Sequence, residues 1–270
     1  MLTKKTINKI KVKPIPIVNK IDTSKIMGGD LFDLYTGICI IGRTGSGKTS
    51  LINEILYQTT NRLTTVILFS STIFNDQNWI YICDSLDKRG TPSIKHTSLI
   101  DESDNSNILD SYVDLFRAQK KEEQETKNQP KKPKKYIIDD SDEKESKMKP
   151  PKKIACKYFF VLDDMSDELK NRSLSSLIKK SRHFESKLLV STQYYCDVEK
   201  SARNQFRYWC LYGGISEDKL DQLHSDIGLS IAVSRFKGLY KDATSEQYNF
   251  LFFDKILEKF RKNLDEEYST

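Results

Sequence analysis

The chain has 270 residues, of which 37% are hydrophobic and 30% are charged, so it can form one large folded domain or two small ones. Its formal net charge is +6, but the segment 119–153 holds 12 lysines and 8 acidic residues and contributes +4 of that total. Net charge alone therefore does not indicate a nucleic-acid ligand. No apolar run approaches the ~20 residues that span a bilayer, and the basic N-terminus lacks the apolar core of a secretory signal, so we expect no membrane association.

The cysteines do not form a pattern that binds metal or builds a disulfide scaffold. There are five of them, no two form a C-x-x-C pair, and the three histidines are far apart. This usage argues against a zinc site and is typical of a reducing compartment. The five are Cys39, Cys83, Cys156, Cys196 and Cys210.

The first 70 residues predict an arm followed by the start of an α/β sheet. Residues 1–30 are rich in lysine and contain two prolines, which favours an extended arm. Residues 37–41 and 65–70 are short apolar runs typical of buried strands. Between them, residues 49–58 carry apolar side chains on one helical face. This order of strand, loop, helix and strand predicts an α/β fold.

The middle of the chain is less regular. Residues 71–117 are mixed in character, with 79–82 and 108–116 predicted to be helical or partly buried. Residues 119–153 have intermixed charges, few large apolar side chains and two lysine-proline clusters. We interpret them as a disordered or weakly ordered insertion that acts as a solvated linker, with DNA contact or nuclear localisation as the alternative.

Strands and helices alternate again after the insertion, which predicts a mostly parallel sheet covered by helices on both faces. The apolar runs predict strands at 157–164, 186–193, 207–214 and 249–254. Helices are expected at 167–180, 216–227 and 256–264.

The segment 42–49 reads GRTGSGKT and fits the phosphate-loop pattern G-x-x-x-x-G-K-[ST] at every fixed position. Its glycines let the backbone curl around a phosphate, and Lys48 is expected to reach the β- and γ-phosphates. The Thr49 hydroxyl is expected to bind Mg²⁺. The strand predicted before the loop and the helix after it match this interpretation. The expected nucleotide contacts are Gly42, Arg43, Thr44, Gly45, Ser46, Gly47, Lys48, Thr49 and Ser50.

The strand predicted at 157–164 ends in two carboxylates. Asp163 is expected to hold Mg²⁺ beside the phosphate loop, and Asp164 is expected to activate the attacking water. Asp is shorter than the Glu that many ATPases carry at this second position. Asp167 and Glu168 also lie nearby, but acids in the first turn of a helix are common there.

Other polar residues near strand ends are candidates for assisting hydrolysis. Gln193 closes the strand at 186–193, where an amide is suited to sensing the γ-phosphate. An arginine from a neighbouring subunit would neutralise charge in the transition state. The arginines available for that role include Arg182, Arg203 and Arg207.

Taken together, the motifs GRTGSGKTS, FFVLDDM, SRHF and LLVSTQ, with Arg203 beyond them, resemble the genome-packaging ATPases of the FtsK/HerA superfamily. The similarity is greatest to the poxvirus-type packaging ATPases of large DNA viruses, virophages and polinton-like elements. The Lys-, Asn- and Ile-rich composition suits the AT-rich genome of such a virus.

The resemblance implies a RecA-like P-loop fold, ATP and Mg²⁺ as cofactors, and a ring of subunits with an ATP site at each boundary. It also implies that the ring drives double-stranded DNA into a preformed capsid, with a capsid or portal component as a partner, in the host cytoplasm or a virus factory. Arg182 and Arg203 are the candidates for the arginine that acts in trans. The domain division is then an arm (1–30), two parts of one ATPase domain (31–118 and 154–270) and the insertion (119–153).

Other functions of a phosphate loop remain open. A nucleotide or small-molecule kinase would use the same loop, although such kinases usually carry an arginine-rich lid. A P-loop switch or scaffold protein would bind nucleotide with slow turnover, and a helicase or conjugation-type translocase is a nearer alternative. Residues 19–22 match the guanine-reading pattern N-K-x-D, but they precede the phosphate loop, so ATP is the expected nucleotide.

Overall fold

The structure is a computed structural model that describes residues 21–128, 153–165, 168–170 and 172–269. Residues 1–20 of the predicted arm and 129–152 of the predicted insertion lie outside these ranges. Within the part that is described, no helix is both long and apolar enough to cross a membrane.

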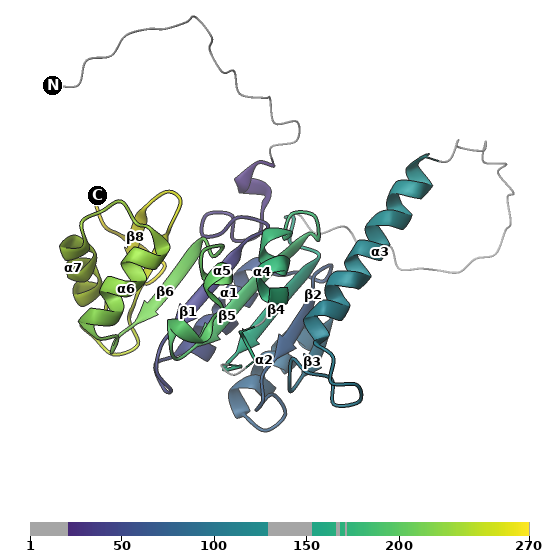
Figure 1. Ribbon diagram of the computed structural model, residues 1–270, viewed down its shortest axis with the longest axis horizontal. Coiled ribbons are helices and arrows are strands. Elements are labelled where there is room, and N and C mark those ends of the chain that lie inside the picture. The colour runs from purple at the N-terminus through teal and green to yellow at the C-terminus, as the bar shows by residue number, and fades with distance from the viewer. Residues whose placement is uncertain (1–20, 129–152, 166–167, 171, 270) are drawn as a thin grey trace, which may run out of the picture.

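The described residues form an α/β fold around a nine-stranded sheet, as predicted (Figure 1). Six neighbouring strands are parallel, and three antiparallel strands extend one end of the sheet. In sheet order the strands are β3 (Ser93–His96), β2 (Thr65–Phe69), β4 (Tyr158–Asp163), β5 (Ser186–Thr192), β1 (Gly37–Ile41), β6 (Tyr208–Tyr212), β7 (Phe250–Asp254), β8 (Lys259–Lys262) and β9 (Glu266–Glu267).

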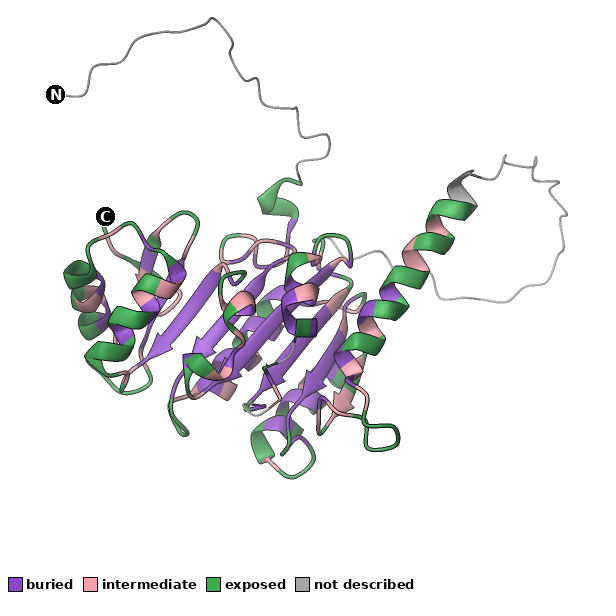
Figure 2. Ribbon diagram, viewed as in Figure 1, coloured by how far each residue is buried: buried purple, intermediate pink, exposed green. Residues whose placement is uncertain are grey.

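Helices cover both faces of this sheet, and the exposed surface is largely their outer sides (Figure 2). In chain order they are α1 (Lys48–Thr59), α2 (Gln77–Lys88), α3 (Ile108–Asn128), α4 (Arg172–Lys179), α5 (Lys200–Arg203), α6 (Glu217–Ile227) and α7 (Val233–Ala243). Two short 3₁₀ helices are η1 (Thr23–Lys25) and η2 (Tyr195–Asp197).

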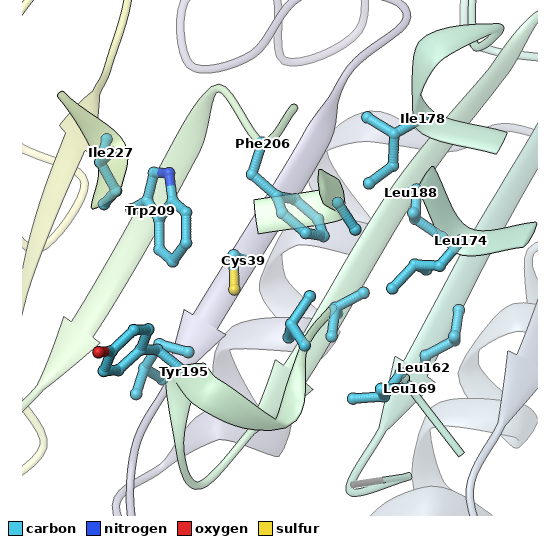
Figure 3. Close-up of a cluster of buried hydrophobic side chains, with 14 of the residues drawn as sticks. Cys39, Leu162, Leu169, Leu174, Ile178, Leu188, Tyr195, Phe206, Trp209 and Ile227 are labelled. Atoms are coloured by element: carbon cyan, nitrogen blue, oxygen red, sulfur yellow. The ribbon is translucent and has the colours of Figure 1, made fainter. Parts of the chain in front are cut away.

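The strands divide their side chains between two cores because successive residues of a strand point to opposite faces. In β1, Cys39 and Ile41 join one core, which is packed by α3 to α7 and is shown in part in Figure 3. Ile38 and Ile40 join the other core, which is packed by α1 and α2. Both faces of the central strands are therefore buried, as the continuous apolar runs predict.

The sheet order determines where the candidate site forms. Strand β1, which leads into the phosphate loop, lies between β5 and β6. Strand β4, which ends in Asp163, is separated from β1 only by β5. Because these strands are parallel, their carboxyl ends meet at one edge of the sheet.

The interpretation of residues 119–153 as disordered or weakly ordered is wrong for its first ten residues, since α3 continues to Asn128. This part of α3 is rich in Lys, Glu and Gln, which have high helix propensity. Lys120 also pairs with Glu123 one turn away, at 2.9 Å, and lies 3.9 Å from Glu185. The charged composition of residues 119–128 therefore suggested disorder, but their helix propensity and local ion pairs stabilise a helix. The predicted helix at 167–180 is shorter in the structure, which has α4 at Arg172–Lys179.

The C-terminal helix expected at 256–264 is wrong, because the structure has strand β8 there. Ile256 and Leu257, two apolar residues that suggested the helix, are 68% and 59% exposed. Phe260 is fully buried and lies opposite Phe253 of β7, with their ring centroids 5.6 Å apart. Packing against the edge of the sheet therefore overrides a weak helical pattern.

Candidate functional site

The phosphate loop connects β1 to α1, as predicted. Gly45 and Gly47 have φ values of 77° and 100°, in the left-handed region that favours glycine. A Cβ on Gly42 would lie 2.5 Å from the Ser46 Oγ atom, so the loop also needs glycine there. The loop runs directly into the N-terminus of α1, whose unpaired N–H groups favour an anion.

Lys48 lies across this loop and is buried. Its Nζ donates hydrogen bonds to the carbonyl oxygens of Gly42, at 2.8 Å, and Arg43, at 3.2 Å. The ammonium group is therefore held against the loop, where a bound phosphate would accept its hydrogen bonds. Tyr212, at the end of β6, donates a hydrogen bond to the carbonyl of Gly47 at 3.2 Å and so supports the loop from the other side.

Asp163 ends β4 and is only 6% exposed. Burial is the largest influence on its carboxyl group and raises its pKa, while Ser191 and the Lys48 ammonium act to lower it. Its Oδ1 atom has no hydrogen-bond partner among the described residues. A buried carboxylate oxygen without a partner, beside a phosphate loop, is suited to binding a cation.

Asp164 follows immediately and is exposed, with a left-handed φ of 54° that is uncommon for a residue other than glycine. Its backbone N–H donates to the carbonyl of Ser191, at 3.0 Å, which ties the turn to β5. Gln193, just after β5, donates from Nε2 to the Asp164 carboxylate at 3.2 Å. The structure thus brings together two residues that are 29 positions apart in the sequence.

These groups line a cavity of about 910 Å³ at the carboxyl edge of the parallel strands. Of the predicted residues, Thr44, Gly45, Gly47, Lys48, Thr49, Ser50, Asp163 and Asp164 line it. Gly42, Arg43 and Gln193 instead line a neighbouring cavity of about 260 Å³. Sequence reasoning missed the remaining wall of the large cavity, which is Leu51, Ser70, Ser71, Thr72, Asp76, Asn78, Tyr212, Tyr248, Asn249, Phe250 and Asn263. Except for Leu51, these come from segments with no local motif, and only the folded chain brings them to the phosphate loop.

The candidate arginines lie away from the cavity of their own chain. Arg182 is exposed in the loop before β5, at the opposite end of that strand from Gln193. Arg203 ends α5, and its guanidinium is 2.9 Å from the Asp226 carboxylate and 5.0 Å from the Tyr195 ring centroid. Arg203 is therefore engaged within its own subunit.

Arg207 is also held within the chain. Its guanidinium pairs with Asp254 at 2.7 Å and contacts Asp33. It therefore fastens β7 and the segment before β1 to the start of β6, at the edge of the sheet away from the cavity.

A family model described as "Poxvirus A32 protein" matches residues 123–255. This match covers just under half of the chain and contains Asp163, Asp164 and Gln193. It does not contain the phosphate loop, so the loop is evidence for a nucleotide site that is independent of the family match. A search of curated proteins gave no significant match.

Solved structures with a similar fold include B204, the DNA-packaging ATPase from Sulfolobus Turreted Icosahedral Virus, with a TM-score of 0.50 and 14% identity over 84% of this chain and 96% of that one. The genome packaging NTPase B204 from Sulfolobus turreted icosahedral virus 2, in complex with ATP-gammaS, has a TM-score of 0.48 and 14% identity over 86% and 98%. Thermomonospora curvata EccC (ATPases 2 and 3) has a TM-score of 0.46 and 13% identity over 87% and 37%. The first likeness supports the fold. The family match, over residues 123–255, confirms the resemblance to the poxvirus-type packaging ATPases that the motifs predict.

Proposed function

We propose that this chain is an ATP-hydrolysing motor that moves double-stranded viral DNA into a preformed capsid. The observation that carries the proposal is the meeting of Lys48, Asp163 and Asp164 at one cavity beside a complete phosphate loop. The family match supports the assignment to genome packaging rather than to another use of the same loop.

The phosphate loop would bind the triphosphate of ATP. Backbone N–H groups of residues 44–49 and the Lys48 ammonium would take the β- and γ-phosphates. Mg²⁺ fits the residues present, because Asp163 Oδ1 lacks a hydrogen-bond partner in the described chain and the Thr49 hydroxyl lines the same cavity. When bound, the ion would supply positive charge that stabilises the negative charge on the phosphate oxygens.

Asp164 is suited to act as the general base of hydrolysis. A water oxygen attacks the γ-phosphorus, the bond from the γ-phosphorus to the bridging oxygen of ADP breaks, and a water proton passes to the Asp164 carboxylate. The products are ADP and phosphate. Gln193 would orient this carboxylate through the hydrogen bond that it donates to it.

Turnover would be completed by a neighbouring subunit in a ring. Both Arg182 and Arg203 lie away from the cavity of their own chain, so either would act on the next subunit's ATP. Arg182 is the better placed of the two, because it is exposed, whereas Arg203 would first have to leave Asp226.

The motor's other partners follow from packaging. It would hold DNA through phosphate contacts without reading sequence, so binding would weaken as salt rises. A capsid or portal component would position the ring, and the host cytoplasm or a virus factory would be the place of action.

Phosphate release with and without double-stranded DNA, at two salt concentrations, tests this function, with Lys48→Ala as the inactive comparison. We expect stimulation by DNA that fades at high salt and disappears in Lys48→Ala. Turnover that is indifferent to DNA would contradict the motor and favour a P-loop switch. A phosphorylated product in place of free phosphate would identify a kinase.

A further inference from the structure

The large cavity has two chemically different sides. Strand β4 lies two positions from β1 in one direction and brings the acids Asp163 and Asp164. Strand β7 lies two positions from β1 in the opposite direction, and this side is lined by Tyr212, Tyr248, Asn249, Phe250 and Asn263. The second side therefore contains aromatic rings and amides, with no formal charge among its lining residues.

A nucleotide would lie across the cavity in one direction. Its γ-phosphate belongs beside the acids of β4, where the metal ion and the attacking water would be. The rest of the molecule must then extend past the start of α1 toward β7. An uncharged aromatic surface is unsuited to a phosphate but suited to a flat base.

Tyr248 is the most prominent group on this side. It is 60% exposed although it is a large aromatic residue, and its φ of 68° lies in the left-handed region. Its Cδ1 atom is 3.5 Å from the position of a Cβ on Gly47, so its ring lies against the phosphate loop. A strained backbone that holds an exposed ring at a cavity indicates a functional role.

Two amides are fixed beside this ring. Asn263, with a φ of 56°, accepts a hydrogen bond at Oδ1 from the Phe250 N–H at 3.2 Å. Its Nδ2 donates to Asn249 Oδ1 at 3.1 Å, and Asn249 Nδ2 donates to Glu246 at 3.0 Å. Each amide group keeps a further donor or acceptor that is not used in these contacts.

We propose that Tyr248, Asn249 and Asn263 form the subsite for the purine base and ribose of the nucleotide, with the base stacked on the Tyr248 ring. The inference rests on the proposed function and adds the part of ATP that the phosphate loop does not recognise. The amides supply donors and acceptors for the polar edge of the base or for the ribose hydroxyls. A purine gives a larger stacking area than a pyrimidine, so ATP is bound more tightly than UTP.

Equilibrium binding of ATP, UTP and inorganic tripolyphosphate to the full chain in Mg²⁺ tests the subsite. In Tyr248→Ala we expect ATP affinity to fall roughly 5- to 150-fold, the range for removing one base–aromatic stack. Tripolyphosphate affinity stays unchanged, and the preference for ATP over UTP shrinks. Tyr248→Phe retains the ring and the affinity. The matched control is Tyr81→Ala, which removes a 66% exposed tyrosine on α2 outside the cavity wall.

The outcomes separate the subsite from the proposed function. Unchanged ATP affinity in Tyr248→Ala overturns the subsite, as does an equal loss for tripolyphosphate, which would mean that Tyr248 only supports the loop. Lys48→Ala must weaken both ligands. If Lys48→Ala weakens the binding of neither ATP nor tripolyphosphate while Tyr248→Ala weakens the binding of ATP, the phosphate-site assignment is wrong and the base subsite is supported. A wild-type chain that binds no ATP overturns both.

Discussion

The side chains of Gln193 and Asp164 share a hydrogen bond at the edge of the sheet, with 3.2 Å between Nε2 and Oδ2. Gln193 follows β5 and Asp164 follows β4, so neighbouring parallel strands bring the two together. The residue suited to sensing the γ-phosphate thus contacts the residue suited to activating water. In the proposed mechanism, a ligand that draws the amide of Gln193 toward itself would release the Asp164 carboxylate and would thereby couple nucleotide sensing to catalysis.

The first prediction concerns Asp164 as the general base. We expect Asp164→Asn to lower the rate of phosphate release by roughly 10²- to 10⁴-fold, the usual contribution of a positioned base. ATP affinity should change little, because the loop and Lys48 remain. Steady-state phosphate release and equilibrium ATP binding measure the two effects. Asp218→Asn, at an exposed acid on α6, is the matched control, and near-normal turnover in Asp164→Asn would refute the role.

The second prediction concerns Asp163 and Mg²⁺. Asp163→Asn keeps the size of the side chain but removes the negative charge beside Lys48 and Thr49. We therefore expect the Mg²⁺ concentration for half-maximal phosphate release to rise, and chelation to abolish wild-type turnover. A titration of MgCl₂ against phosphate release measures the shift. An unchanged Mg²⁺ midpoint would show that Asp163 does not hold the ion.

The third prediction separates the two arginines. Arg203→Ala removes the partner of Asp226 at 2.9 Å, leaves it only the exposed Lys200 at 3.8 Å, and removes the contact with Tyr195, so we expect it to lower the free energy of unfolding by about 1–3 kcal/mol. Arg182→Ala is at an exposed position and should leave stability unchanged while reducing turnover of the assembled ring. Urea unfolding and phosphate release distinguish them. Normal turnover in Arg182→Ala, with a stable but inactive Arg203→Ala, would reverse the assignment.

The fourth prediction uses the buried lysine of β5. Lys187 is 1% exposed, and its Nζ is 5.7 Å from the Phe32 ring centroid and 5.8 Å from that of Phe159. Burial lowers its pKa from the ordinary 10.5. Between the folded-state pKa and 10.5 the unfolded chain binds more protons, so the free energy of unfolding rises with pH across that window.

We expect Lys187→Met to raise the free energy of unfolding at pH 7 by on the order of 1–2 kcal/mol, since no charge need then be buried or neutralised. The difference from wild type should shrink as the pH rises toward 10.5. Urea unfolding at pH 7 and at pH 10 measures it, with the exposed Lys241→Met as control. A destabilised Lys187→Met at both pH values would show that the ammonium is stabilised in place.

The sequence predicted the parts of the site that are local in the chain. The phosphate loop is eight consecutive residues between an apolar run and an amphipathic helix, and Asp163 and Asp164 end another apolar run. Such patterns consist of residues that are close together in the sequence, so they can be recognised without knowledge of the fold. The parallel sheet was predictable for the same reason, because strands buried on both faces are continuously apolar.

The far wall of the cavity could not be predicted, because it depends on contacts between distant segments. Tyr248 and Asn263 line the same cavity as the phosphate loop only because β6 and β7 follow β1 across the sheet. The prediction of a helix at 256–264 was wrong for a related reason. The packing of Phe260 against Phe253, a residue of a different strand, favours a strand over a helix there. The contact between Gln193 and Asp164 could likewise not be predicted without knowing that β4 and β5 are neighbours in the sheet.

The most direct test of the motor is displacement of a triplex-forming oligonucleotide from linear double-stranded DNA by the purified chain. Because an ATP-driven translocase strips a bound third strand as it moves, we expect displacement with ATP and Mg²⁺, none without ATP, and none with Lys48→Ala. Phosphate release that is stimulated by this DNA, in reactions where the third strand stays bound, would contradict translocation.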